Sequence, residues 1–198
     1  MTQANALELE RRPTPQVRDE ATAFVGMVIF LASWAILFIA LFFAYGFVRL
    51  RQTTWPPADL PRLPVWLPAL NTLVIALSGA VLQFGLHSLR RGRELAPALA
   101  ASAALGFAFL ALQWVLWTRV YDAGLRTSTG VYASVFYMLT VVHALHVVVG
   151  LVALVGLAIR AQRGAYSTAR HLSIRLWTLY WHFVGIVWGC VFVTVFLL

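Results

Sequence analysis

The sequence predicts an all-α integral membrane protein built on five transmembrane helices. Five apolar stretches run through the chain, and none of them contains an aspartate or a glutamate. Each is about 20 residues or longer, which at ~1.5 Å of rise per residue crosses a hydrocarbon core of ~30 Å. The composition agrees, because 61% hydrophobic and 11% charged residues, with a mean hydropathy of +0.81, exceed what a soluble domain of 198 residues can hide.

The five spans follow one another with short polar segments between them. They run Phe24–Val48, Leu67–Leu86, Ala96–Thr118, Val131–Ile159 and Leu176–Leu198. All seven acidic residues lie outside them, at Glu8, Glu10, Asp19, Glu20, Asp59, Glu94 and Asp122. A proton relay or ion pathway usually needs a buried charge, and a transporter often has an interrupted helix, so the spans favour neither a pump nor a transporter.

Residues 1–23 form a polar segment before the first span, and residues 24–198 form the transmembrane domain. The segment has prolines at Pro13 and Pro15, mixed charges and no apolar core of the signal-peptide type. We therefore expect the first span to direct insertion, and we expect the segment to be a cytoplasmic tail that becomes ordered only against a partner.

The orientation follows from the arginines, since every basic residue counted in the +8 charge is an arginine. With the N-terminus in the cytoplasm, the inner segments hold ten arginines and the outer segments hold five. Cytoplasmic segments carry the excess of positive charge, so the sequence predicts N-in and C-out. Arginines placed at lipid headgroups account for the positive charge, and nucleic acid is not expected as a partner.

Small residues on the helices predict close packing. Gly185 and Gly189 form a G-x-x-x-G pattern in the last span, and span three is rich in alanine. In lipid, such surfaces let helices approach closely. Two interpretations stay open: packing within this subunit, or docking of a larger partner. The single cysteine, Cys190, excludes an internal disulfide.

Three histidines lie inside the spans. His143 and His146 share a face of span four, because they are three residues apart, and His182 lies in span five. Imidazoles in a membrane can ligate haem or copper, but no carboxylate or second cysteine supports a metal site, so we expect none in this chain. We expect at least one of the pair, and His182, to point inward and to hydrogen-bond neighbouring helices, lipid or water.

Two basic clusters lie at the predicted inner ends of the spans. Arginine can hold a lipid phosphate by paired hydrogen bonds, so these clusters predict sites for phospholipid headgroups as well as topology signals. The first cluster is Arg90, Arg91 and Arg93 with His87, and the second is Arg170, His171 and Arg175. The sequence contains no nucleophile paired with a base, no glycine-rich phosphate loop and no paired acids, so no catalytic residue is predicted.

Two segments have distinctive amino-acid sequences. Phe136–Leu151 reads FYMLTVVHALHVVVGL, and Tyr180–Leu198 reads YWHFVGIVWGCVFVTVFLL. These segments resemble subunit III of the haem-copper oxidases. Shorter matches occur in the same order, at Gly26–Tyr45, Trp55–Pro57, Leu70–Thr72, Gln113 and Arg163–His171, so the resemblance extends over all five spans. The five-helix length is similar to short bacterial forms, which implies a bacterial inner membrane.

The chain departs from this family at four positions. Trp34, Leu116, Arg175 and Gly185 stand where the family usually carries an acidic residue. In the family these acids lie near a lipid-filled cleft and the contact with subunit I. The loss of all four indicates a divergent subfamily in which the neighbours changed together, because one unpaired survivor in hydrocarbon would be costly.

The resemblance implies an accessory subunit of a terminal oxidase in aerobic electron transport. Such a subunit would stabilise the catalytic subunit I, which would carry the haem and copper, and would bind phospholipid. Catalysis would then belong to the whole cytochrome c or quinol oxidase complex. Two alternatives stay open: an accessory or assembly subunit of a nitric oxide reductase, and an autonomous membrane cytochrome.

Overall fold

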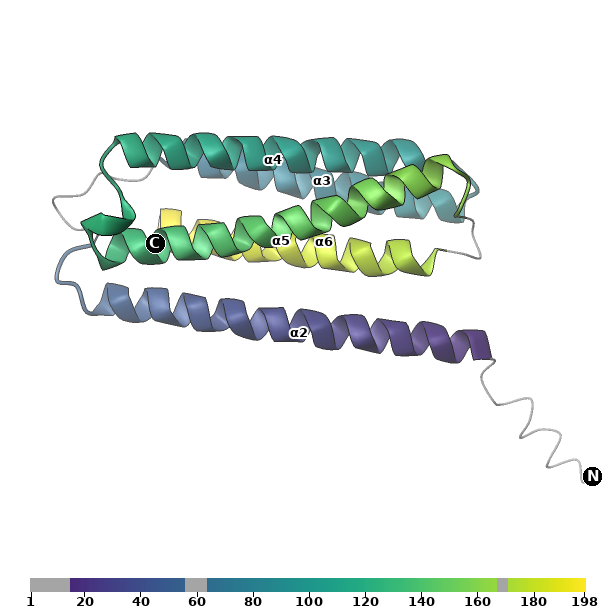
Figure 1. The fold of residues 1–198 in the computed structure, drawn as a ribbon, viewed down its shortest axis with the longest axis horizontal. Helices are drawn as coiled ribbons and strands as arrows, with labels where there is room; N and C mark the ends of the chain where they lie inside the picture. Colours follow the sequence, from purple (N-terminus) through teal and green to yellow (C-terminus); the bar gives the residue numbers. More distant parts are fainter. Residues whose placement is uncertain (1–14, 56–63, 167–170) are drawn as a thin grey trace, which may run out of the picture. The chain divides into compact units, whose positions relative to one another are not determined.

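The described residues of the computed structural model, 15–55, 64–166 and 171–198, are helical and contain no strand. Figure 1 labels the main helices along the chain. They are α2 (Pro15–Leu50), α3 (Trp66–Arg90), α4 (Ala96–Asp122), α5 (Val131–Gln162) and α6 (Leu172–Val191), with a short 3-10 turn at Thr127–Thr129 and a π-helical end at Phe192–Leu197. Among these described residues, five helices are long and apolar enough to cross a membrane, which confirms the predicted all-α, five-helix membrane fold.

Helix α2 is longer than its apolar sequence predicts. It begins at Pro15, whereas the predicted span begins at Phe24. Proline is favoured in the first turn of a helix, where its missing N–H costs no hydrogen bond, and the charged residues that follow are compatible with a helix. The hydrophobic pattern marks the part of a helix that enters lipid, so it misses a polar first turn.

The chain divides into two compact units, residues 1–35 and 36–198. The first unit contains the N-terminal part of α2. Its small polar side chains bond their own helix: Thr22 Oγ1 donates to the carbonyl of Arg18, and Ser33 Oγ donates to the carbonyl of Ile29, both at 2.9 Å. Such bonds to the preceding turn satisfy hydroxyl groups where water is absent.

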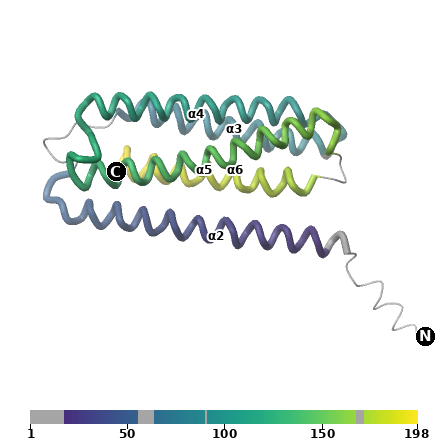
Figure 2. The backbone as a smooth tube through the Cα atoms, in the orientation of Figure 1, coloured from purple at the N-terminus to yellow at the C-terminus, as the bar shows by residue number. Residues whose placement is uncertain are grey.

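Helices α3 to α6 form a four-helix bundle within the second unit. Each helix packs on the next one in the chain, and α6 returns to pack on α3, so the four enclose a common core (Figure 2). The largest fully buried side chains are aromatic: Trp181, Trp188, Tyr180, Phe109 and Phe136. The core of the bundle therefore consists mainly of aromatic rings, which pack against small residues on the neighbouring helices.

Three helices of the bundle end with the same glycine turn. Gly92, Gly124 and Gly164 follow α3, α4 and α5, and their φ angles are +74°, +99° and +71°. In the first turn, the N–H of Gly92 bonds the carbonyl of Leu89, and the N–H of Arg93 bonds that of Ser88. This paired arrangement is a Schellman motif, and it needs a residue with positive φ, which only glycine adopts at low cost. The three turns reverse the chain between neighbouring helices.

The C-terminal part of α2 contacts α5 through aromatic side chains. Phe38 is 2% exposed, and its ring centroid lies 5.1 Å from that of His146. Nearer the end of the helix, the ring of Tyr45 meets Trp55 at 5.5 Å, and Trp55 meets Tyr132 of α5 at 4.8 Å. Both pairs are edge-to-face, the arrangement that aromatic rings prefer.

Candidate functional site

A pair of serines joins α3 and α4 at the centre of the bundle. Ser78 and Ser102 are both fully buried, their hydroxyl oxygens lie 2.9 Å apart, and each hydroxyl also lies within 3.0 Å of the other residue's carbonyl oxygen. The indole nitrogen of Trp181 on α6 donates to Ser78 Oγ at 3.0 Å. Three helices therefore share one group of hydrogen bonds, in an interior where unpaired polar atoms would be costly.

A second polar contact lies closer to the start of α3. Asn71 Nδ2 donates to Gln113 Oε1 at 3.3 Å, and both side chains are at most 1% exposed. The neighbouring Thr72 accepts a hydrogen bond from the indole nitrogen of Trp188 at 3.0 Å. Helices α4 and α6 are thus both bonded to the same turn of α3. These side chains orient helices rather than activate a substrate.

His143 and His146 lie on the buried face of α5, with exposed fractions of 1% and 7%. Aromatic rings surround His143: Phe38 at 6.3 Å, Phe109 at 5.9 Å and Trp188 at 5.3 Å between centroids. Its two ring nitrogens have no hydrogen-bond partner among the residues that the structure describes. Among the described residues, His143 therefore makes contacts between aromatic rings and no side-chain hydrogen bond.

The backbone around the histidine pair bonds α6 to α5. The hydroxyl of Tyr180 donates to the carbonyl oxygen of His146 at 2.9 Å. His146 Nδ1 lies 2.7 Å from the carbonyl oxygen of Val142, one turn earlier on the same helix. His146 therefore has one ring nitrogen close to a carbonyl oxygen of its own helix, and the Tyr180 hydroxyl joins α6 to the backbone of α5.

His182 lies on another side of α6, against α3. Its Nε2 lies 3.2 Å from Gln83 Oε1. The ring is held over Gly79, where an added Cβ would come within 3.3 Å of His182 Nδ1. The three histidines of the spans therefore do not form one group: His143 and His146 rest against Phe38, and His182 bonds α3.

The closest approaches between helices occur at glycines other than the predicted pair. The tightest is at Gly85 of α3, where an added Cβ would collide with the Cβ of Ala98 on α4. A Cβ on Gly150 would meet the Trp181 ring at 2.8 Å and the Tyr180 ring at 2.9 Å, and one on Gly106 would also meet Trp181. Gly189 has no atom within 4 Å of its added Cβ, and Gly185 has only Ile75 at 4.0 Å. The G-x-x-x-G pattern of α6 therefore lies on a face with free space.

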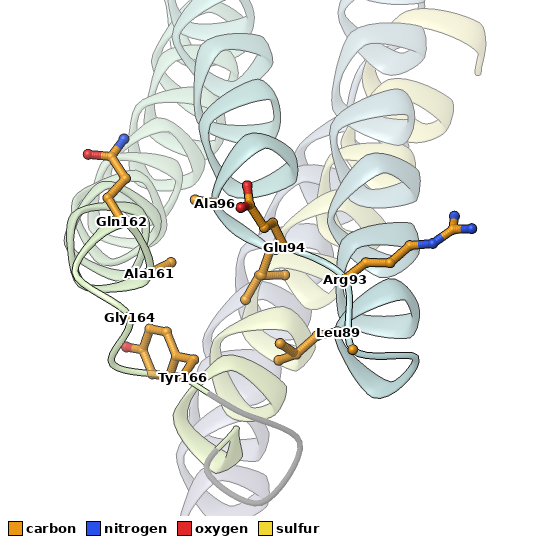
Figure 3. A pocket seen from close by; sticks show the side chains of 10 residues that line it. Leu89, Arg93, Glu94, Ala96, Ala161, Gln162, Gly164 and Tyr166 are labelled. Atoms are coloured by element: carbon orange, nitrogen blue, oxygen red, sulfur yellow. The ribbon is translucent and has the colours of Figure 1, made fainter.

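A cavity lies at the end of the bundle where α3 leads into α4 and α5 leads towards α6. Its volume is about 660 Å³, and residues of the two connecting segments line it (Figure 3). Leu89 and Ala161 supply apolar walls, while Glu94, Gln162 and Tyr166 supply polar groups. In Figure 3 the Glu94 carboxylate lies beside Ala96, whereas Arg93 extends away on the other side of the loop.

The predicted basic clusters lie at this same end of the bundle. Arg91, Arg93, His87 and Arg175 are exposed, and His171 is half-buried. Arg170 falls outside the described residues, and the side chain of Arg90 is not described. Of the described side chains in the first cluster, Arg93 lines the cavity. Among the described residues, no group of three His, Cys, Asp or Glu side chains could hold a metal ion.

Comparison with known proteins identifies the fold and its motifs. The family model described as "Cytochrome c oxidase subunit III" matches residues 12–198. The chain belongs to the cytochrome c oxidase subunit III family. "Cytochrome c oxidase subunit 3" of Synechocystis sp. is 36% identical over 176 residues, which cover 87% of this chain and 74% of the relative. The proteins of the same name from Ornithorhynchus anatinus and Squalus acanthias are 32% and 33% identical over 179 residues, covering 86% of this chain and 67% of each relative.

As a subunit III, the chain is a multi-pass membrane protein and an accessory subunit of a haem-copper oxidase, in complex with the other oxidase subunits. The two segments that carried the resemblance contact each other in its fold. Tyr180, which begins one segment, bonds His146 of the other, and Trp181 packs on Gly150. Residues of the two motifs therefore form part of the contact between α5 and α6.

The sequence did not identify the serine pair as a bonded group. Ser78 reads as a small residue in span two, and Ser102 is one of several small residues in span three. The available signal was a polar residue inside each of two neighbouring apolar spans, because such a residue needs a partner in lipid. Which residues pair depends on the rotation of each helix, and this is set by packing.

Proposed function

We propose that this chain packs on the catalytic subunit I of the oxidase, stabilises it, and contributes no redox centre of its own. One observation carries the proposal: the described polar side chains inside the spans mostly bond or pack against other helices of the chain. His143, the most buried histidine, is enclosed by rings and not by ligands. The haem and copper would lie in subunit I.

Phospholipid binding is the second part of the proposal. The cavity of about 660 Å³ has apolar walls at Leu89 and Leu95 and polar groups at Glu94 and Gln162, and the guanidinium of the lining residue Arg93 extends away from them (Figure 3). This arrangement suits a lipid headgroup that spans the loop, since an acid can bond an amine and arginine can bond a phosphate. The apolar part would accept the first carbons of a chain. The exposed Arg91 and Arg175 at the same end would add attraction for lipid phosphates.

The proposed orientation places this end of the bundle in the cytoplasm of a bacterium whose inner membrane holds the complex. The arginine bias of ten against five supports N-in and C-out. The relative from Synechocystis is cyanobacterial, which agrees with a bacterial source. On this orientation residues 1–23 begin on the cytoplasmic side.

Nitric oxide reductase is the second candidate for the complex. The reason to consider it is that the family's usual acidic residues are missing at four positions, Trp34, Leu116, Arg175 and Gly185. Leu116 is fully buried. An acidic side chain at this position would need a hydrogen-bonding partner in the interior, and leucine needs none. The relatives are named as cytochrome c oxidase subunits, which favours the oxidase. Assays of oxygen uptake and nitric oxide reduction by the purified complex separate the two.

Deletion of the gene tests the proposed function in the cell. The account expects less assembled oxidase in the membrane, with the haem bands of the remaining enzyme unchanged in position. Expression of the chain in the deletion strain should restore the amount. If the deletion strain has a normal oxidase content, the accessory role is wrong.

A further inference from the structure

We propose that the groove between α3 and α6 receives a transmembrane helix of the catalytic subunit, and that this helix donates a hydrogen bond to His182. The inference rests on the proposed function, because it says which face of the chain makes the contact. The groove has a volume of about 260 Å³, and Ala76 and Gly79 of α3 line it together with His182, Gly185 and Ile186 of α6.

Glycines make the groove. Gly185 has only one atom within 4 Å of its added Cβ, and Gly189, one turn further, has none. Gly79 leaves room for the His182 ring on the opposite wall. Ile186, which lines the groove, is 67% exposed. The result is a shallow channel with apolar edges, which is the shape that another helix fills when two helices approach closely in lipid.

A polar pair in the wall of the groove distinguishes a helix from lipid as its occupant. The His182–Gln83 bond is exposed on the outside of the bundle. At 1.5 Å per residue, Gln83 lies ~10 Å from the end of α3 at Arg90, and His182 lies ~15 Å from the start of α6 at Leu172. Both are deep enough to lie in hydrocarbon. Lipid chains offer polar groups no hydrogen bonds at this depth, whereas a helix can.

The chemistry of the pair defines the partner. Gln83 Oε1 can only accept a hydrogen bond, so His182 Nε2 must carry the proton in the 3.2 Å contact. A neutral imidazole then has an acceptor at Nδ1, which lies over Gly79 at the groove and has no hydrogen-bond partner among the described residues. The matching side chain is a donor, a hydroxyl or an amide, on a helix with small residues. This pairing would fix both the position and the rotation of the docked helix.

Filling the groove tests the proposal in the assembled complex. Gly185→Leu should reduce the amount of haem-containing catalytic subunit that copurifies with the tagged chain by about tenfold. The reason is that the leucine side chain would fill the space in the groove that the docked helix needs. Gly156→Leu on α5 is the matched control, since Gly156 also has no atom within 4 Å of its added Cβ. The melting temperature of each isolated variant checks that the chain itself still folds. Equal copurification of the two variants would overturn the proposal.

Cross-linking tests the same face without blocking it. A photoreactive cross-linker on Ile186→Cys, in a Cys190→Ala background, should join the catalytic subunit. The same label on Val152→Cys of α5, which is equally exposed at 69%, should join it at least ~10-fold less. Products only with lipid, or only with a second copy of this chain, would overturn the proposal. If the unmodified chain does not copurify with a haem protein at all, the proposed function fails instead.

Discussion

Trp181 on α6 donates its indole N–H to the hydroxyl of Ser78 on α3, at 3.0 Å and in full burial. The same indole ring occupies the space left by Gly106 on α4 and Gly150 on α5. One side chain thus contacts all the other helices of the α3–α6 bundle. The position of α6 is fixed by a large ring, two glycines and one directional bond.

Removing the bond at Ser78 should destabilise the subunit. Ser78→Ala leaves the Trp181 N–H and the Ser102 hydroxyl with one partner fewer, and we expect a loss of about 1–2 kcal/mol in the free energy of unfolding. Ser78→Ala combined with Trp181→Phe should cost less than the sum of the single changes, by about 0.5–1.5 kcal/mol. Trp114→Phe, at a position 65% exposed, is the control. Additive effects would show that the bond does not contribute.

Adding a side chain at Gly150 should have a larger effect. Gly150→Val would place carbon atoms into the rings of Trp181 and Tyr180, which lie 2.8–2.9 Å from the first added atom. We expect a loss of about 1–3 kcal/mol or more, because large rings in a packed core cannot move aside. Gly156→Val on the same helix meets no atom within 4 Å and should be near neutral. Thermal unfolding of both variants in detergent measures the difference, and equal melting temperatures would contradict the packing described here.

Replacing His143 separates its ring from its nitrogens. His143→Phe keeps ring contacts with Phe109 and Trp188 and removes two nitrogens that have no partner among the described residues. We expect stability and assembly within about 1 kcal/mol of the unmodified chain, and no change in the haem spectrum of the complex. A shift of the haem bands with the subunit ratio intact would place this histidine next to a redox centre and contradict the accessory role.

The fold was predictable because the membrane imposes a length and a composition. Five spans without acids specify five helices, and the helix ends differ from the prediction mainly where polar turns extend them, as at Pro15 of α2. The contacts were less predictable. Gly185 and Gly189 match a packing pattern, yet the tight contacts form at Gly85, Gly106 and Gly150. A G-x-x-x-G spacing shows that a face is smooth, but the rotation of the helix decides what that face meets.

The lipid proposal predicts a local effect of Arg93. Arg93→Ala should lower the phospholipid retained by the purified complex, measured by native mass spectrometry, since Arg93 is the arginine that lines the cavity at the loop end. Arg126→Ala at the opposite end of the bundle is the control, because Arg126 lies over the ring of Tyr121 at 5.0 Å. Equal lipid content in both variants would leave the Arg93 cluster with a role in topology alone.

Purification of the tagged chain from its native membrane tests the central claim most directly. The account predicts a complex in which the chain accompanies a haem- and copper-containing catalytic subunit in equal amount. After the subunits are separated, a dithionite-minus-air spectrum of the chain should show no stoichiometric Soret or alpha band. A chain that purifies without a haem protein, or that carries stoichiometric haem bands by itself, would contradict the account.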